Sequence, residues 1–302
     1  MFIHNPDPFL LPSYRISPFK TDFISINTNL PNEEYCISYL NEKFGEGNWQ
    51  FTYNGREGIK LALESYNLKS TDLVTILTTS QNFYISSCVT KTIELFCTWN
   101  REILPQTTVI FVNHEFGYPY PDMEQLVATG IPIIEDCCTT FFSQDKSRKV
   151  GSYGDFSVYS LPKYFPIQIG GILTNNVKNK PLKKSILTIA EKEYIQKVLS
   201  YHLKTEKVLL QKRKTIYEYA LETLLPLGFT LRFATQKGII PYALLLNNNS
   251  TIKDLPLLKT YLTNNGIQCS VFYGEDAFFL PIHQNLTCLD IDYFKHIIIS
   301  YH

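Results

Sequence analysis

The fold of this chain is decided by the stretch Ile133-Ile134-Glu135-Asp136, which leads through Phe156-Ser157-Val158-Tyr159-Ser160 to Leu161-Pro162-Lys163. Two apolar, strand-like runs end in polar residues, a lysine follows the second run, and the pair Gly170-Gly171 comes a few residues later. In open parallel sheets, ligands gather at the carboxyl ends of the strands. We therefore expect Asp136 to lie at a ligand-binding edge.

An acid at the end of one strand and a lysine just past another form an uncommon combination. A lysine amine can condense with the aldehyde of a pyridine cofactor and hold it as a Schiff base. A carboxylate can keep the ring nitrogen protonated, so that the ring accepts electrons. Lys163 and Asp136 are therefore the predicted catalytic pair. The alternatives are a solvated surface lysine and an acid that caps a turn or helix.

The composition indicates a globular chain without a nucleic-acid partner. With 302 residues, 44% of them hydrophobic and 19% charged, the chain can bury a substantial core in one large domain or two modest ones. Its 28 Lys and Arg residues balance 28 Asp and Glu residues. Nucleic-acid-binding proteins normally carry a basic excess, which is missing here.

No stretch of the sequence has the pattern of a targeting signal or a membrane span. Residues 1–18 lack a charged-then-apolar leader, and no apolar run approaches the roughly 20 residues of a spanning helix. The expected location is cytoplasmic. The seven cysteines fit this location, because their odd number and spacing suit neither a disulfide framework nor a zinc site. We expect Cys137 and Cys138 to be small buried side chains beside the site, and we predict no metal centre.

Strand-like and helical patterns alternate as far as residue 175. Such alternation is typical of parallel βαβ units. We therefore predict an α/β fold, with a mostly parallel central sheet flanked by helices. The expected strands are 73–78, 107–113, 131–136, 156–161 and 172–175, and the expected helices are 33–44, 59–68, 122–128 and one that ends near 96.

A long helical pattern from about Leu187 to Leu225 leads into a different kind of segment. Its apolar residues recur every three or four positions, and Gly228 ends it. Beyond it we expect strands near 230–233, 240–246 and 267–273, and helices near 255–264 and 290–298. We predict a large α/β domain of residues 1–200 and a smaller C-terminal α+β domain of residues 201–302.

The turn Gly55-Arg56-Glu57-Gly58 precedes an apolar helical pattern. The start of a helix offers free backbone N–H groups and a favourable dipole, so it can bind an anion. Taken alone this signal is weak, because such turns are common and are more typical of an ordinary capped helix.

Together these segments resemble the DegT/DnrJ/EryC1/StrS family of sugar aminotransferases, which are pyridoxal 5'-phosphate (PLP) enzymes of fold type I. The specific part is the block from Ile131-Pro-Ile-Ile-Glu-Asp136 through Val150-Gly-Ser-Tyr-Gly-Asp155 to Lys163 and Gly170-Gly171. The segment 279–287 is similar to the family's closing segment, and we interpret its His283 as structural. The resemblance covers most of the chain in the right order.

The resemblance implies roles for individual residues. Lys163 would hold the cofactor aldehyde and then move the proton between substrate carbon and cofactor carbon. Asp136 would pair with the protonated ring nitrogen. Phe83 would stack on the ring face, with Tyr84 as the competing choice and a packed core aromatic as the alternative for Phe83. Thr139 stands near the ring hydroxyl, where the family commonly has an amide side chain.

The resemblance also implies a binding site for the cofactor phosphate. Ser160 would donate its hydroxyl, and the backbone around Arg56, Glu57 and Gly58 would add N–H groups. The Arg56 guanidinium could bind the phosphate or the carboxylate of an amino donor, or it could be solvated. The family usually has a small-residue turn at this position. The loop after Gly170-Gly171, which helps to form the substrate pocket across the dimer, is short in this chain.

The implied activity is that of a PLP-dependent aminotransferase. It would convert a keto-sugar nucleotide to an amino sugar with an amino-acid donor, most simply glutamate, for a polysaccharide or a secondary metabolite. The alternatives are another PLP-dependent reaction, such as that of a dehydratase or a small-ketone aminotransferase, and a catalytically degenerate family member. The resemblance further implies a homodimer, small-molecule substrates, and neither a membrane nor a nucleic-acid partner.

Overall fold

A computed structural model describes residues 13–146, 150–177 and 180–301 of the chain. The chain divides into two compact units, one formed by Phe19–Thr205 and the other by Met1–Pro18 together with Glu206–His302. The division after Thr205 lies close to the predicted boundary after residue 200. The described residues 13–18 group with the C-terminal unit, whereas the prediction placed them in the large domain. Residues 1–12 lie outside the described part.

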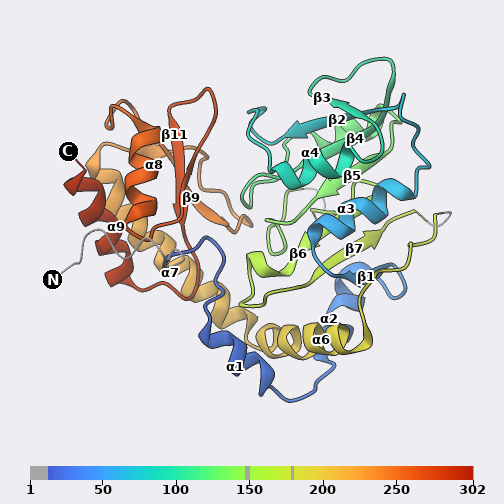
Figure 1. Cartoon of the computed structure of the whole chain (residues 1–302), viewed down its shortest axis with the longest axis horizontal. Coiled ribbons are helices and arrows are strands. Elements are labelled where there is room, and N and C mark those ends of the chain that lie inside the picture. Colours follow the sequence, from blue (N-terminus) through green and yellow to red (C-terminus); the bar gives the residue numbers. More distant parts are fainter. Residues whose placement is uncertain (1–12, 147–149, 178–179, 302) are drawn as a thin grey trace. The chain divides into compact units, whose positions relative to one another are not determined.

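The unit Phe19–Thr205 is built on a seven-stranded sheet with the order β1-β7-β6-β5-β4-β2-β3 (Figure 1). All pairings from β3 through β2, β4 and β5 to β6 are parallel, whereas β7 and β1 join antiparallel. The mostly parallel sheet predicted from the sequence is therefore confirmed. The strands are β1 (Trp49–Thr52), β2 (Leu73–Thr78), β3 (Thr98–Asn100), β4 (Thr107–Asn113), β5 (Ile133–Asp136), β6 (Phe156–Ser160) and β7 (Gly171–Asn175).

Helices cover both faces of this sheet. Residues of α3 (Gly55–Glu64) and α4 (Ser87–Ile93) form one apolar core with residues of the central strands. Residues of α5 (Met123–Ala128) form a second core on the other face of the sheet, together with alternate residues of β4 and β5. Central strands buried on both faces read as nearly continuous apolar runs, which is why the sequence predicted β2 and β4 so well.

Three further helices belong to the same unit: α1 (Asp22–Thr28), α2 (Tyr35–Phe44) and α6 (Ile189–Lys204). The start of α2 is fastened to α6, because the Cys36 amide donates to the Ser200 hydroxyl at 2.9 Å. The first residues of α6 form a capping box, in which Thr188 and Glu191 satisfy each other's backbone amides.

The second unit contains a four-stranded antiparallel sheet with the order β10-β11-β9-β8. The long helix predicted over residues 187–225 is two helices, because the helical conformation is interrupted at Thr205. The elements of this unit are α7 (Glu206–Leu224), η2 (Leu225–Leu227), β8 (Thr230–Leu231), β9 (Ala243–Asn247), α8 (Leu255–Asn264), β10 (Ser270–Val271), β11 (Ala277–Pro281) and α9 (Cys288–Ser300).

This second unit has its own apolar core, which α7, α8 and α9 share with β9 and β11. His283, two residues after the end of β11, is almost fully buried. One of its ring nitrogens bonds to the carbonyl of Arg15 and the other accepts from the Asn285 amide. These contacts agree with the structural interpretation of His283. Among the described residues, no helix is both long enough and apolar enough to cross a bilayer.

Candidate active site

The carboxyl ends of β4 and β5 bring a carboxylate and an amide together. Asp136 ends β5 and is 4% exposed. Its Oδ2 accepts a hydrogen bond from Asn113 Nδ2 at 2.9 Å, and its Oδ1 accepts from the Cys138 amide at 3.0 Å. These two donors hold the carboxylate in one orientation. The sequence indicated the acid but not its partner, since Asn113 becomes a neighbour only through the register of β4 with β5.

Lys163 ends a short 3-10 turn, η1 (Leu161–Lys163), which follows β6 directly. The Leu161 amide at the start of this turn donates to the Gly170 carbonyl at 3.0 Å. The lysine is half-buried. The glycine pair therefore closes the loop that carries the lysine.

The Cys138 thiol links the lysine and the acid electrostatically. Burial and the Asp136 carboxylate raise the pKa of Cys138, whereas the Lys163 ammonium lowers it. Both charges thus act on one thiol. Because burial outweighs the lysine, the thiol stays protonated, as expected for a small side chain beside a site.

The start of α3 lies against the same residues. A Cβ atom built on Gly55 would be 2.9 Å from the Cys138 Sγ and 3.9 Å from the Ser160 Oγ. Only a residue without a side chain allows this approach. The turn before α3 also passes close to Gly171, because a Cβ on Gly171 would be 2.8 Å from the Asn54 carbonyl carbon and 2.5 Å from the Thr52 Oγ1.

The backbone amides at the start of α3 are not equally available. Asn54 caps the helix, and its Oδ1 accepts from the Glu57 amide at 2.9 Å. The Gly58 amide donates to the Asn54 carbonyl at 3.2 Å. The amides of Gly55 and Arg56 donate to no other described residue. An anion at this helix start would therefore meet those two N–H groups, and not the ones predicted for Glu57 and Gly58.

The Glu57 carboxylate serves the protein itself. It is largely buried and accepts hydrogen bonds from the Tyr53 amide, from the Ser185 hydroxyl at 3.0 Å and from the Ile186 amide at 2.7 Å. These bonds tie the segment before α6 to the start of α3. The sequence gives no sign of this role, because two of the partners, Ser185 and Ile186, are more than 120 residues away along the chain.

The structure places the remaining predicted residues around the same edge. Phe83 follows β2 in a loop and is 70% exposed. Tyr84 packs against Phe116, with ring centroids 6.0 Å apart. The Thr139 hydroxyl donates to the His114 carbonyl at 2.9 Å and accepts from the Gly117 amide at 3.2 Å. The Ser160 hydroxyl has no hydrogen-bond partner in the described part of the chain, and the Arg56 side chain is exposed.

Glu135 and His114 form a buried acid–histidine pair next to these residues. The sequence analysis did not predict this pair. The Glu135 carboxylate accepts from the amides of Gly151, Tyr153 and Gly154 at 2.7–3.0 Å and contacts His114 Nε2 at 3.0 Å. His114 Nδ1 accepts from the Tyr120 amide at 3.0 Å, so Nε2 carries the proton. His114, Glu135 and Cys137 lie close enough for a metal site. Hydrogen bonds, however, already occupy the donor atoms of the histidine and the acid.

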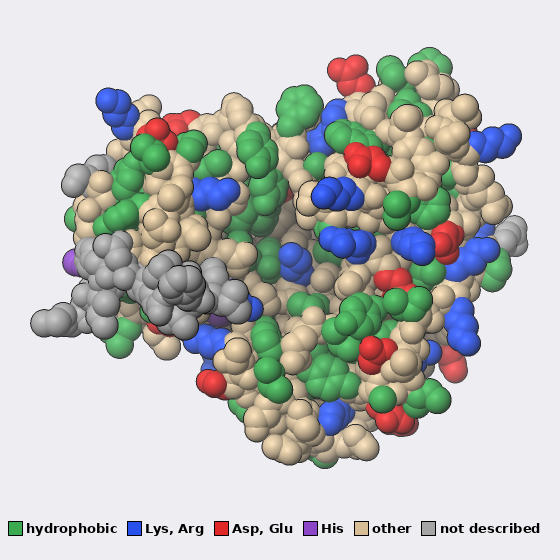
Figure 2. Space-filling view, in the orientation of Figure 1, with side chains coloured by type: hydrophobic (Ala, Val, Ile, Leu, Met, Phe, Trp, Pro, Cys, Tyr) green, Lys and Arg blue, Asp and Glu red, His purple; other side chains and the backbone are tan. Residues whose placement is uncertain are grey.

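One hollow lies beside the start of α3, and another lies in the C-terminal unit. A groove of about 330 Å³ beside α3 is lined by Arg56, Lys60 and Lys184 with the exposed Leu95 and Ile186. Figure 2 shows Lys and Arg side chains gathered over the face that α3 and α4 cover. The groove combines cationic and apolar walls.

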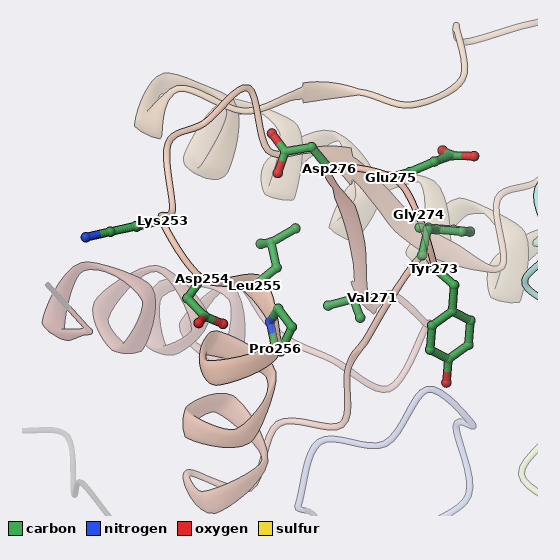
Figure 3. Close-up of a pocket in the computed structure, with 10 residues that line it drawn as sticks. Lys253, Asp254, Leu255, Pro256, Val271, Tyr273, Gly274, Glu275 and Asp276 are labelled. Atoms are coloured by element: carbon green, nitrogen blue, oxygen red, sulfur yellow. The ribbon is translucent and has the colours of Figure 1, made fainter.

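The other hollow, in the C-terminal unit, has a volume of about 570 Å³ (Figure 3). Two of its acids maintain local structure. Asp254 caps α8 by accepting from the Leu257 amide at 2.8 Å, and Asp276 accepts from Asn248 Nδ2 at 2.7 Å and from the Ser250 amide at 2.9 Å. This hollow contains none of the predicted site residues.

The fold is that of the fold-type-I sugar aminotransferases. The aminotransferase TlmJ from Streptoalloteichus hindustanus is similar with a TM-score of 0.74, at 15% identity, over 96% of this chain and 100% of TlmJ. A Streptococcus pneumoniae protein in its PLP form is similar with a TM-score of 0.70, at 15% identity, over 98% of this chain and 99% of that protein. At such identities the similarity concerns the fold alone.

Residues 98–188 match the model of the DegT/DnrJ/EryC1/StrS aminotransferase family. An 84-residue segment is 34% identical to GDP-perosamine synthase of Escherichia coli O157:H7 and covers 26% of this chain and 23% of that enzyme. The chain thus matches about a quarter of the length of this curated relative. The predicted family resemblance is confirmed, since the Asp-to-Lys block lies within the matched residues.

The residues present fit a pyridoxal phosphate. Asp136, whose carboxylate is fixed by hydrogen bonds, lies at the carboxyl end of β5. Lys163 lies in the turn that follows the neighbouring strand β6. Beside them lie the hydroxyl of Ser160 and the amides of Gly55 and Arg56, which no described residue uses. Unused donors at a helix start are what a phosphate group requires.

Proposed function

We propose that this protein is a PLP-dependent aminotransferase that converts a keto-sugar nucleotide to an amino sugar. The observation that carries the proposal is that Asp136 and the start of α3 both lie against Cys138, while Lys163 lies in the turn that directly follows the neighbouring strand β6. It is supported by the fold and by the family match over residues 98–188. When bound, the cofactor supplies an electron-accepting ring.

The two charged residues divide the chemistry between them. The Lys163 amine would hold the aldehyde group of the cofactor, and the same amine would move a proton to or from the substrate carbon. The Asp136 carboxylate would keep a proton on the ring nitrogen, and Asn113 orients this carboxylate. The lysine would thus act as base and acid in turn.

The remaining residues bind and orient the cofactor. The Ser160 hydroxyl and the amides of Gly55 and Arg56 hold the phosphate at the start of α3, with the helix dipole favouring the negative charge. The Thr139 hydroxyl has one acceptor lone pair left, which could bind the ring hydroxyl, and Phe83 would stack on the ring. The Arg56 guanidinium contacts the phosphate or the carboxylate of the donor.

The substrate class rests on the curated relative, whose name states a GDP-linked product. An amino-acid donor, glutamate in the simplest case, supplies the nitrogen, and a polysaccharide or a secondary metabolite receives the sugar. We also propose a homodimer, in line with the exposed apolar Leu95 and Ile186 beside α3. The cytoplasmic location stays a prediction from the sequence.

The test is a half-reaction without any sugar. Purified protein is loaded with pyridoxal phosphate, mixed with glutamate, glutamine, aspartate or alanine, and assayed for the released 2-oxo acid. We expect one equivalent per site from at least one donor and none from Lys163→Ala. Cofactor binding without 2-oxo acid from any donor would contradict amino transfer. A panel of keto-sugar nucleotides then separates amino transfer from dehydration by product mass.

A further inference from the structure

We propose that Arg101, which follows β3 directly, is a positioning residue that holds the loop Thr78–Phe83 in the shape required for cofactor binding. This inference rests on the proposed function, because the loop presents Phe83 and leads to Tyr84, the two candidates for stacking on the cofactor ring. Because β2 and β3 are parallel, Arg101 and the start of the loop lie at the same edge of the sheet.

The Arg101 guanidinium joins the two ends of the loop. Its Nη2 donates to the Thr78 Oγ1 at 3.2 Å and to the Asn82 carbonyl at 2.6 Å. The Thr78 hydroxyl itself donates to the same carbonyl at 2.9 Å. These three bonds close the loop at its base. Bonds to a charged donor are stronger than neutral ones, so the guanidinium contributes the larger share.

The same guanidinium lies over the ring of Phe83, 5.5 Å from its centroid. A cation above an aromatic face is attracted by the quadrupole of the ring, so the contact favours this orientation of the Phe83 side chain. Phe83 is nevertheless 70% exposed. The arginine therefore holds one face of an aromatic side chain that remains open to a ligand.

A second charge holds the loop from the neighbouring strand. Glu115, just past β4, is almost fully buried, and its carboxylate accepts from the Ser80 amide. Its own amide donates to the Thr79 hydroxyl at 3.0 Å. Burial lowers the pKa of Arg101 and Glu115 raises it, which indicates that the two charges stabilise each other across the loop.

The loop needs such support, because its backbone is strained. Gln81 has a φ of 60°, in the left-handed region that a residue with a side chain rarely adopts. Strained residues persist where the surrounding contacts fix them. Arg101 binds both residues that flank this stretch, Thr78 and Asn82. Lysine could not replace it, since an ammonium lacks the planar fork that reaches the loop and the ring together.

The test compares Arg101→Met and Arg101→Lys with Lys91→Met, an exposed control in the last turn of α4. Amide hydrogen exchange of the segment 79–86 is followed in the cofactor-free protein. We expect exchange about tenfold faster in both arginine variants and unchanged in the control, because the closing bonds are lost. Titration of pyridoxal phosphate should then show an affinity about tenfold weaker in both arginine variants.

The outcomes distinguish the inference from the proposed function. Unchanged exchange in Arg101→Met would overturn the inference, whether or not the cofactor binds. Faster exchange with unchanged cofactor affinity would also overturn it, since the loop would then not serve the cofactor. If the wild-type protein bound no cofactor, the proposed function would fail, while the exchange rates would still decide whether Arg101 holds the loop.

Discussion

A buried carboxylate helps a cofactor ring only while it stays charged and correctly oriented. The orientation of Asp136 depends on two neighbours that donate hydrogen bonds, the Asn113 side chain and the Cys138 amide. The backbone donor is fixed by the turn after β5, whereas the Asn113 amide can be removed by substitution. Asn113 is therefore the residue that tests how the acid is held.

We predict that Asn113→Leu lowers the affinity for pyridoxal phosphate about tenfold, because one hydrogen bond to a charged group is worth roughly 1.5 kcal/mol. Asn113→Asp should lower it further, since a second carboxylate raises the pKa of the first. Titration of the cofactor by visible absorbance gives both dissociation constants. Equal affinities for the three proteins would show that Asn113 does not act on Asp136.

At the scale of elements, the position of α3 depends on one close contact. Gly55 and Cys138 leave space for no further atom, as the 2.9 Å between the Cys138 Sγ and a built Cβ shows. Gly55→Ala must therefore shift either the thiol or the helix start. We predict a loss of about 1–2 kcal/mol in the free energy of unfolding, the usual cost of overpacking.

The double variant Gly55→Ala, Cys138→Ala should recover most of that loss, because the smaller side chain makes room for the new methyl group. Chemical denaturation of the wild type, both single variants and the double variant gives the coupling free energy. If the losses in unfolding free energy were additive, the contact with Cys138 would not be the cause of the destabilisation by Gly55→Ala.

The sequence predicted those helices and strands that carry a clear apolar pattern along their own residues. β2 and β4 are long, apolar and buried, so their predicted bounds agree with the structure. β3 has three residues and lies at an edge of the sheet, so it carries no apolar pattern. The break at Thr205 was missed because apolar positions recur on both sides of it.

The site could be predicted only in part, for a related reason. Asp136 and Lys163 follow strands directly, so their place is visible along the chain. Asn113 and Arg101 act through strand register, and the partners of Glu57 come from a distant segment. Contacts of this kind exist only in the folded molecule.

At the scale of the whole molecule, acid stability depends on a histidine in the last turn of α6. The Nε2 of His202 is buried without a hydrogen-bond partner among the described residues. Burial lowers its pKa from 6.5 to about 4. In the unfolded chain the same ring titrates near its ordinary value. Between these two pKa values the unfolded state binds more protons than the folded state, so stability falls as the pH falls.

We predict that His202→Gln removes part of this acid sensitivity. Between pH 6.5 and pH 5 the wild type should lose up to about 2 kcal/mol more unfolding free energy than the variant, since each pKa unit corresponds to about 1.4 kcal/mol. Above pH 7 the difference should be independent of pH, because both states are then neutral. Urea denaturation at four pH values measures it. Parallel curves for the two proteins over the whole range would contradict the prediction.

The central claim, that Lys163 binds the cofactor covalently, has one direct measurement. Protein loaded with pyridoxal phosphate is reduced with borohydride, digested, and analysed by mass spectrometry for the lysine that carries the phosphopyridoxyl group. We predict a single modified lysine, Lys163, and no modification in Lys163→Arg under the same conditions. A label on another lysine, or none on loaded protein, would contradict the claim.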